Sequence, residues 1–266
     1  MHKACAEGRR AYMISAVLFD MGGTLHTSHT DEARRLWFAR RLMDRLGDYG
    51  IGIGLSEEAF SDLLDRNAAE YKAESERTYR ELPPDVVWNE WFLKGLDIPA
   101  ERIRPIAEEL SFLYDYERVC NVRRPGLVEC MAALRSAGLR LGIISNIISE
   151  SIVPHFLAEY GISQMMDCVV TSSGTGLRKP SPAIFRVAEE ALRLPPESLV
   201  YVGDTLSRDV LGVRNAGWCA VIQIDNPASR HRDAGLEHAH IEPDYFIHDL
   251  NEIPALIARI EEEERV

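Results

Sequence analysis

Four groups of polar residues carry side chains that suit phosphate and metal chemistry. The first group is an aspartate with two glycines and a threonine close behind it, directly after the short apolar run Ala16 to Phe19. A carboxylate at the end of a buried strand can bind a cation or attack an electrophile. Neighbouring glycines let backbone N–H groups approach an anion closely. The group reads Asp20-Met21-Gly22-Gly23-Thr24-Leu25.

The other three groups stand farther along the chain, mostly at the ends of predicted strands. They are Ser145-Asn146, Lys179-Pro180 and Gly203-Asp204 through Asp209. Each alone has an ordinary explanation as a helix cap or a surface charge. However, Lys179 is one of only four lysines beside twenty-six arginines, which favours a specific need for a lysine. The order of the four groups favours one common site at the carboxyl edge of a sheet.

The elements that must position these residues follow two different patterns. From residue 122 onward, predicted strands alternate with predicted helices, which indicates a parallel sheet. The run Ala16 to Phe19 belongs to this sheet because it is apolar enough to be buried on both faces. We therefore predict an α/β fold with a doubly wound parallel sheet. Its later strands are predicted at 139–144, 168–171, 199–202, 220–224 and 245–247. The helices between and after them are predicted at 126–134, 149–160, 182–192, 206–216 and 250–260, with a loop at 226–243.

Residues 26–121 show apolar residues at a spacing near 3.6, which predicts helices, and they show no strand pattern of comparable strength. We expect the aromatic stripes here to form a core between helices. The predicted helices are 31–46, 56–79, 85–96 and 99–116. The predicted domains are a core of residues 13–26 and 122–266, an inserted helical domain of residues 27–121 and an N-terminal tail of residues 1–12. The links fall near 26–30 and 119–124.

Composition limits the partners of the chain. A net charge of −12 argues against nucleic acid or an anionic membrane as the main partner. The five cysteines form no close pair and suit reduced thiols in a cytoplasmic protein. No apolar run approaches the ~18 residues of a membrane span. We expect a cytoplasmic location and leave the oligomeric state open.

In the order and identity of the four groups, the chain resembles the haloacid dehalogenase superfamily of hydrolases, with a helical cap inserted after the first strand. The resemblance implies a Rossmann-like core and makes Asp20 a nucleophile that forms an aspartyl-phosphate. It implies Mg²⁺ bound by Asp20, the main-chain oxygen of Gly22 and Asp204, with support from Asp209. The implied phosphate ligands are Thr24, Ser145, the N–H of Asn146 and Lys179. The implied activity is that of a phosphatase for a small phosphorylated metabolite.

One position departs from the phosphatase pattern of this superfamily. A second aspartate usually stands two residues after the nucleophile and exchanges protons with the leaving group and water, whereas this chain has Gly22. Its absence matters because general acid–base catalysis typically contributes ~10²–10⁴-fold in rate. One interpretation places this function elsewhere, in His26, in His29, in the cap or in the substrate itself. Another is a phosphatase restricted to good leaving groups, such as acyl or aryl phosphates.

Two further interpretations remain open. Superfamily members that cleave carbon–phosphorus bonds also lack the second aspartate and use a cap lysine as a Schiff base, for which the chain offers Lys72 and Lys94. Members that cleave carbon–halogen bonds work without a metal, and the complete pair Asp204 and Asp209 argues against that branch. The last interpretation is a phosphate-binding regulatory module without turnover. The retained nucleophile argues against it.

Overall fold

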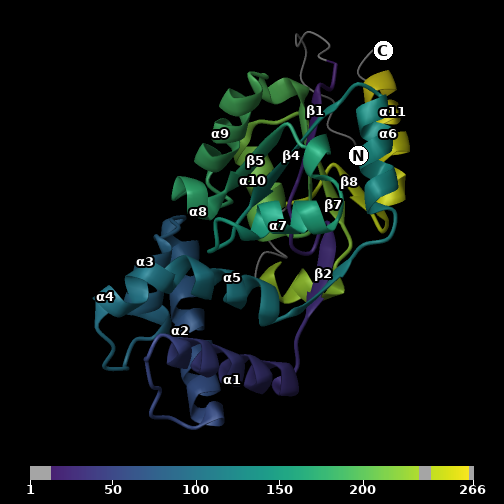
Figure 1. Cartoon of the computed structure of the whole chain (residues 1–266). Helices are drawn as coiled ribbons and strands as arrows, with labels where there is room; N and C mark the ends of the chain where they lie inside the picture. Colours follow the sequence, from purple (N-terminus) through teal and green to yellow (C-terminus); the bar gives the residue numbers. More distant parts are fainter. Residues whose placement is uncertain (1–12, 234–240, 264–266) are drawn as a thin grey trace.

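The computed structural model describes residues 13–233 and 241–263, which fold around a six-stranded parallel sheet (Figure 1). The strand order is β5-β4-β1-β6-β7-β8, so β1 lies between β4 and β6. The chain therefore builds the sheet first on one side of β1 and then on the other, which confirms the doubly wound α/β prediction. The strands are β1 (Ala16–Phe19), β4 (Arg140–Ser145), β5 (Cys168–Thr171), β6 (Leu199–Gly203), β7 (Ala220–Ile224) and β8 (Tyr245–Ile247).

Helices cover both faces of this sheet. On one face α6 (Leu127–Ser136), α7 (Ile152–Glu159) and α11 (Ile253–Glu263) share a hydrophobic cluster with Val17 and Phe19. On the other face α9 (Pro182–Leu192) and α10 (Leu211–Ala216) pack with Ala16 and Leu18. All four β1 side chains are fully buried, which explains the unbroken apolar run. Shorter helices are α8 (Ser172–Thr175) and the 3₁₀ turns Ser163–Met165, Pro196–Ser198, Pro227–Asp233 and Leu250–Glu252.

The helices between β2 and β3, here called the helical block, pack on one another below the sheet in Figure 1. Trp88 and Phe92 are fully buried in its hydrophobic cluster, as expected. Trp37 differs, because it is 45% exposed and stacks under the guanidinium of Arg34. The block contains α1 (Glu32–Asp48), α2 (Glu57–Thr78), α3 (Pro84–Val86), α4 (Ala100–Ile103), α5 (Ala107–Glu117), a π-helical turn Val87–Phe92 and a 3₁₀ turn Arg104–Ile106.

The structure corrects the prediction at the links to this block. β2 (His26–His29) and β3 (Cys120–Arg123) form an antiparallel pair where no strand was predicted. These strands are short and partly polar, and their pairing joins residues about a hundred positions apart. The Ser28 hydroxyl, for example, donates to the Asn121 side chain. Hydrophobic alternation cannot reveal such strands.

Two helices predicted in the block are helical over most of their predicted length, but neither is a continuous α-helix. The predicted helix 85–96 ends at Phe92 and is mostly π-helical. The predicted helix 99–116 is interrupted at Pro105, which lacks an N–H and crowds the preceding turn. The helix predicted at 206–216 likewise begins as a π-helical turn, Leu206–Val210.

Other boundaries differ in smaller ways. The helix predicted from Ser149 begins at Ile152, and the loop predicted after Asn226 contains the 3₁₀ turn Pro227–Asp233. The predicted tail of residues 1–12 lies outside the described residues. No helix in the described ranges has the length and apolar character needed to cross a membrane.

Candidate active site

The four predicted groups meet at the carboxyl edge of the sheet, where β1, β4 and β6 end side by side. This edge borders a cavity of 220 Å³. Asp204 and Asp209 lie beside it, with carboxylate oxygens within 4.8 Å of one another and of Asp20. Thr24 is fully buried and its hydroxyl has no partner among the described residues. The predicted residues that line the cavity are Asp20, Gly22, Ser145, Asn146 and Lys179.

Lys179 links two of the three buried carboxylates. Its Nζ lies 2.9 Å from Asp20 Oδ1 and 2.7 Å from Asp209 Oδ1, and it donates to the Tyr201 hydroxyl at 2.8 Å. Burial raises the pKa of Asp20 in spite of Lys179. Burial and the two neighbouring carboxylates raise the pKa of Asp204 to about 6. The edge therefore carries more negative charge than its lysine neutralises.

Asp209 is occupied in holding the loop after β6. Burial opposes its ionisation, but Lys179, Arg208 and hydrogen bonds keep its pKa below the usual value. Its Oδ2 accepts from the backbone N–H groups of Asp204 and Thr205 and from the Thr205 hydroxyl. A side chain on Gly203 would stand 2.4 Å from Asp209, so glycine is required for this approach. The geometry gives Asp209 a positioning role.

The acidic edge suits a divalent cation. Asp204 Oδ2 accepts from Asn226 Nδ2 at 2.8 Å, whereas its Oδ1 is buried without a hydrogen-bond partner among the described residues. An orphaned carboxylate oxygen beside Asp20 is a donor of the kind that Mg²⁺ prefers. Gly23 has φ +88°, and a Cβ there would stand 2.1 Å from Asp204 Oδ2. Only glycine lets the two loops close around this site.

Two side chains hold the lysine in place: Asn146, which was predicted only through its backbone N–H, and Tyr201, which was not predicted. Asn146 Oδ1 accepts from the backbone N–H of Lys179 at 2.9 Å, and Asn146 Nδ2 donates to the Lys179 carbonyl at 3.0 Å. The Tyr201 hydroxyl, which accepts from Lys179, donates to the carbonyl of Ile144 at 2.8 Å. Nothing local marks Tyr201, since it stands inside an apolar strand.

The space beside Gly22 is occupied by a histidine. Apart from the adjacent residues Met21 and Gly23, a Cβ on Gly22 would have only His26 Nε2 within 4 Å among the described atoms, at 3.8 Å. The His26 ring is buried, which lowers its pKa to about 4, and its Nδ1 lies 3.0 Å from the Tyr160 hydroxyl. His26 lines the cavity, whereas His29 is exposed on the same strand.

A second titratable group reaches the cavity from the helical block. Asp115 of α5 lines it, and its Oδ2 accepts from the backbone N–H groups of Ile148 and Ser149. Burial raises the pKa of Asp115 to about 7. No local sequence feature distinguishes this residue from the other acids of the block.

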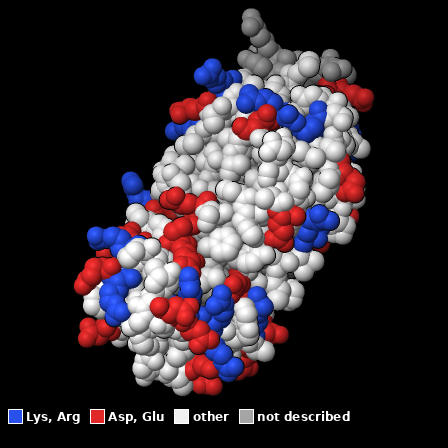
Figure 2. Space-filling model, viewed as in Figure 1, with Lys and Arg blue, Asp and Glu red and all other residues white. Residues whose placement is uncertain are grey.

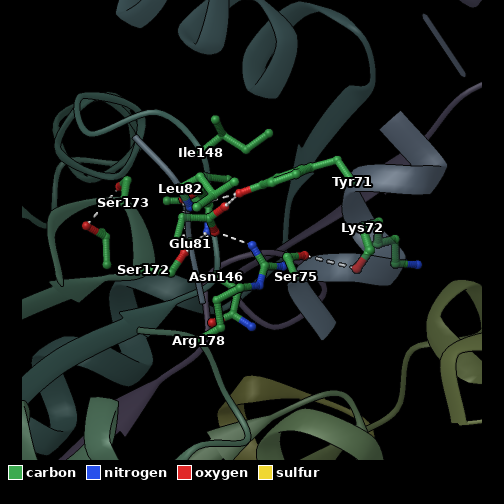
Figure 3. A network of polar contacts seen from close by, with 12 residues as sticks. Tyr71, Lys72, Ser75, Glu81, Leu82, Asn146, Ile148, Ser172, Ser173 and Arg178 are labelled. Atoms are coloured by element: carbon green, nitrogen blue, oxygen red, sulfur yellow. Dashed lines mark hydrogen bonds and ion pairs between the residues drawn. The ribbon is translucent and has the colours of Figure 1, made fainter. Parts of the chain in front are cut away.

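A buried polar network ties the helical block to the loop that carries Lys179 (Figure 3). The carboxylate of Glu81 accepts from the hydroxyls of Tyr71 and Ser172 and forms an ion pair with Arg178. Arg178 also donates its backbone N–H to the carbonyl of Tyr79 at 3.0 Å. Because Arg178 directly precedes Lys179, this network fixes the lysine relative to the block.

Comparisons with known proteins agree with this geometry. The chain is similar to a glyceraldehyde 3-phosphate phosphatase of Methanopyrus kandleri, 29% identical over 211 residues that cover 79% of this chain and 83% of the relative. It is 31% identical over 149 residues to a phosphoserine phosphatase of Thermus thermophilus, covering 55% of this chain and 56% of the relative. Among solved structures, a HAD phosphatase from Thermococcus onnurineus has a TM-score of 0.58 at 26% identity, covering 91% of this chain and 97% of that one.

A family model described as haloacid dehalogenase-like hydrolase matches residues 14–217. The match includes all four polar groups and the whole helical block. The fold, the meeting of the four groups and this match together make the chain a member of the haloacid dehalogenase-like hydrolases.

Proposed function

We propose that this chain is a Mg²⁺-dependent phosphatase that hydrolyses a small phosphorylated metabolite through an aspartyl-phosphate on Asp20. One observation carries the proposal: the Asp20 carboxylate lines a cavity between Lys179 and the orphaned oxygen of Asp204. This arrangement offers a nucleophile, a fixed positive charge and a cation ligand together. Relatives named as phosphatases support phosphate as the reacting group.

In this proposal each residue has a separate task. The Asp20 oxygen that Lys179 does not bind attacks phosphorus, and water later hydrolyses the acyl phosphate. Ser145 and the N–H of Asn146 bind phosphoryl oxygens, and Lys179 offsets the charge that gathers there. Mg²⁺ held by Asp20, the Gly22 carbonyl and Asp204 supplies further charge neutralisation when bound. Thr24 adds a hydroxyl at the same loop.

The helical block has a separate place in the proposal. We interpret residues 27–121 as a cap over a core formed by residues 13–26 and 122–266. The β2–β3 pair connects the two, and the block contributes Asp115 to the cavity of the nucleophile. A cap in this position excludes bulk water from Asp20 and selects the substrate.

The proton that a second aspartate would carry is assigned to His26. Its Nε2 lies beside the place where a side chain on Gly22 would project, and it makes no hydrogen bond with a described residue. The Tyr160 hydroxyl holds Nδ1, so Nε2 is the atom free to meet the leaving oxygen or the attacking water. A single imidazole in place of a carboxylic acid favours substrates with good leaving groups.

The test compares an aryl phosphate with an alkyl phosphate, each with and without Mg²⁺. Turnover that requires the metal and vanishes in Asp20→Asn, while the variant keeps its circular dichroism and melting temperature, supports the covalent mechanism. We expect the aryl ester to be hydrolysed faster. Retained activity in Asp20→Asn would exclude the aspartyl-phosphate. A folded protein that binds Mg²⁺ and hydrolyses neither ester would point to a binding module or to carbon–phosphorus cleavage.

One observation favours carbon–phosphorus cleavage as the second candidate. Lys72 lines a cavity that adjoins the cavity of the nucleophile, and burial together with nearby arginines lowers its pKa. A lysine of lowered pKa is suited to Schiff-base formation. Lys94 instead pairs with Glu70 at 3.0 Å on the surface. Borohydride trapping of an aldehyde phosphonate on Lys72, absent in Lys72→Met, would support this candidate over the phosphatase.

A further inference from the structure

A second cavity, of 490 Å³, adjoins the cavity of the nucleophile and lies between the helical block and the core. The two cavities share five lining residues, among them Arg208 and Arg232. Its wall is strongly basic, with six cationic side chains and two acidic ones. The cationic residues are Arg35, Lys72, Arg118, Arg178, Arg208 and Arg232, and the acidic residues are Asp65 and Asp115.

Several of these cations have partners within the protein. Arg35 lies 3.7 Å from Asp65, and Arg178 forms the buried ion pair with Glu81. Arg118 stacks on the ring of Tyr114. These side chains are therefore satisfied, at least in part, before any ligand arrives.

Arg208 and Arg232 differ from the others. Neither side chain makes a hydrogen bond, an ion pair or an aromatic ring contact with any residue in the ranges 13–233 and 241–263. Arg232 is exposed and Arg208 is partly buried, and both are attracted by Asp20, Asp204 and Asp209. Because no carboxylate forms an ion pair with either guanidinium, their N–H donors remain available to an anion in the cavities.

The basic cavity contrasts with the rest of the molecule. The whole chain carries a net charge of −12. On the face shown in Figure 2, lysine and arginine side chains are interspersed with acidic ones over the helical block. The two arginines without an ion-pair partner therefore lie where the two cavities meet, next to the acidic edge, and a general basic surface does not explain their position.

We propose that Arg208 and Arg232 bind a second anionic group of the substrate, a carboxylate or another phosphate, while the scissile phosphate lies on Asp20. The proposal rests on the proposed phosphatase function and specifies its substrate class. Both arginines line both cavities, so one small molecule can reach them and the nucleophile together. A guanidinium binds carboxylate or phosphate through two parallel hydrogen bonds, which gives selectivity as well as affinity.

The carboxylates of the acidic edge do not remove the need for such an anion. Arg208 is attracted to Asp209, Asp20 and Asp204, and this attraction raises its pKa although burial opposes it. No ion pair joins it to any of the three, while Lys179 already contacts two of them. Arg208 is thus close enough to feel the acidic edge and free to bind a ligand.

The first test uses two probes of equal carbon number that differ in one anionic group. We expect kcat/KM for 3-phosphoglycerate to exceed that for glycerol 3-phosphate by at least ~10-fold, since each bond to a charged group is worth about one to two powers of ten. Arg208→Gln and Arg232→Gln should each reduce this ratio toward one. Arg230→Gln is the matched control. Arg230 lies in the same 3₁₀ turn as Arg232, but it is exposed and pairs with Asp225. It should leave the ratio unchanged.

The second test measures binding without turnover. In Asp20→Asn, calorimetry should show tighter binding of 3-phosphoglycerate than of glycerol 3-phosphate, and Arg232→Gln should remove the difference. Equal affinity for the two probes, or an equal loss for both in the arginine variants, would overturn the second-anion site. Preferential binding of 3-phosphoglycerate without hydrolysis of any phosphate ester would retain this site and reject the phosphatase proposal. The two proposals therefore fail separately.

Discussion

The charged side chains around the two adjoining cavities differ in whether they are paired within the protein. Beside Asp20, Lys179 contacts two carboxylates and a tyrosine, and Asp209 accepts from four donors. Arg208 and Arg232, which line both cavities, make no ion pair with a described residue. The charged side chains beside Asp20 fix one another through ion pairs and hydrogen bonds, whereas the guanidinium groups of these two arginines remain available to a ligand.

Under the proposed function, this difference separates the groups that carry out the reaction from the groups that recognise the substrate. Catalytic groups gain from being fixed before the substrate arrives, because the site then needs little reorganisation in the transition state. Groups that recognise a substrate must be unpaired, since an internal partner would compete with the ligand. The comparison therefore predicts large effects on turnover and stability in the first cavity, and selective effects on substrate preference in the second.

The largest effect is expected for Lys179→Met. It leaves Asp20 and Asp209 as buried carboxylates without their shared cation, so kcat should fall by about 10²–10³-fold. The free energy of unfolding should fall by about 3–5 kcal/mol, measured by urea denaturation without Mg²⁺. Lys94→Met, which removes an exposed lysine paired with Glu70, is the control and should change both by little. Equal behaviour of the two variants would contradict the fixed-charge view of the first cavity.

Glu81→Gln tests whether the network in Figure 3 joins the helical block to the loop that carries Lys179. The change leaves Arg178 almost buried without its counter-ion, which should cost about 3 kcal/mol of unfolding free energy. Because Arg178 precedes Lys179, kcat should fall as well. Glu74→Gln breaks the exposed pair with Arg77 and should cost less than ~1 kcal/mol. Unchanged kcat in Glu81→Gln would show that the network holds the block without positioning the lysine.

His26→Gln should lower turnover of alkyl phosphates by about 10²-fold and that of aryl phosphates by less, because aryl leaving groups need less protonation. His29→Gln, on the exposed end of the same strand, should have no effect. Adding Gly22→Asp to His26→Gln should restore part of the alkyl activity, since apart from the adjacent residues no described side chain but His26 lies within 4 Å of a Cβ there. Equal losses for both ester classes would assign His26 a structural role.

Features with a local physical cause could be predicted from the sequence. The run Ala16 to Phe19 is apolar because β1 is buried on both faces, and Asp20 follows because that strand ends at the ligand-binding edge. Asp31 and Ser56 cap α1 and α2 through their own side chains, so both helix starts were confirmed. These causes act between residues a few positions apart, so the local sequence pattern reveals them.

Features that depend on distant partners could not be predicted. Arg208 and Arg232 are two of many arginines, and only the fold brings them to one cavity. Asp115 becomes a cavity residue because α5 packs against the loop after β4. Tyr201 becomes a lysine partner because β6 lies next to β1. The two arginines of the proposed second-anion site belong to this second kind, so the sequence predicted a reaction type and left the substrate open.

The smallest expected effect concerns the pH dependence of metal binding. The pKa of Asp204 is raised to about 6, so below pH 6 a proton competes with Mg²⁺ for this carboxylate. The Mg²⁺ concentration needed for half-maximal activity should rise about tenfold per pH unit below 6 and stay constant above it.

Without metal, the raised pKa of Asp204 means that the folded state binds more protons than the unfolded one between pH 4 and 6. The free energy of unfolding should therefore fall as pH rises through this window, and saturating Mg²⁺ should oppose that fall. Asp204→Asn should lose both dependences, whereas a half-maximal Mg²⁺ concentration that is equal at pH 5 and pH 7 in the unaltered protein would argue against Asp204 as a metal ligand.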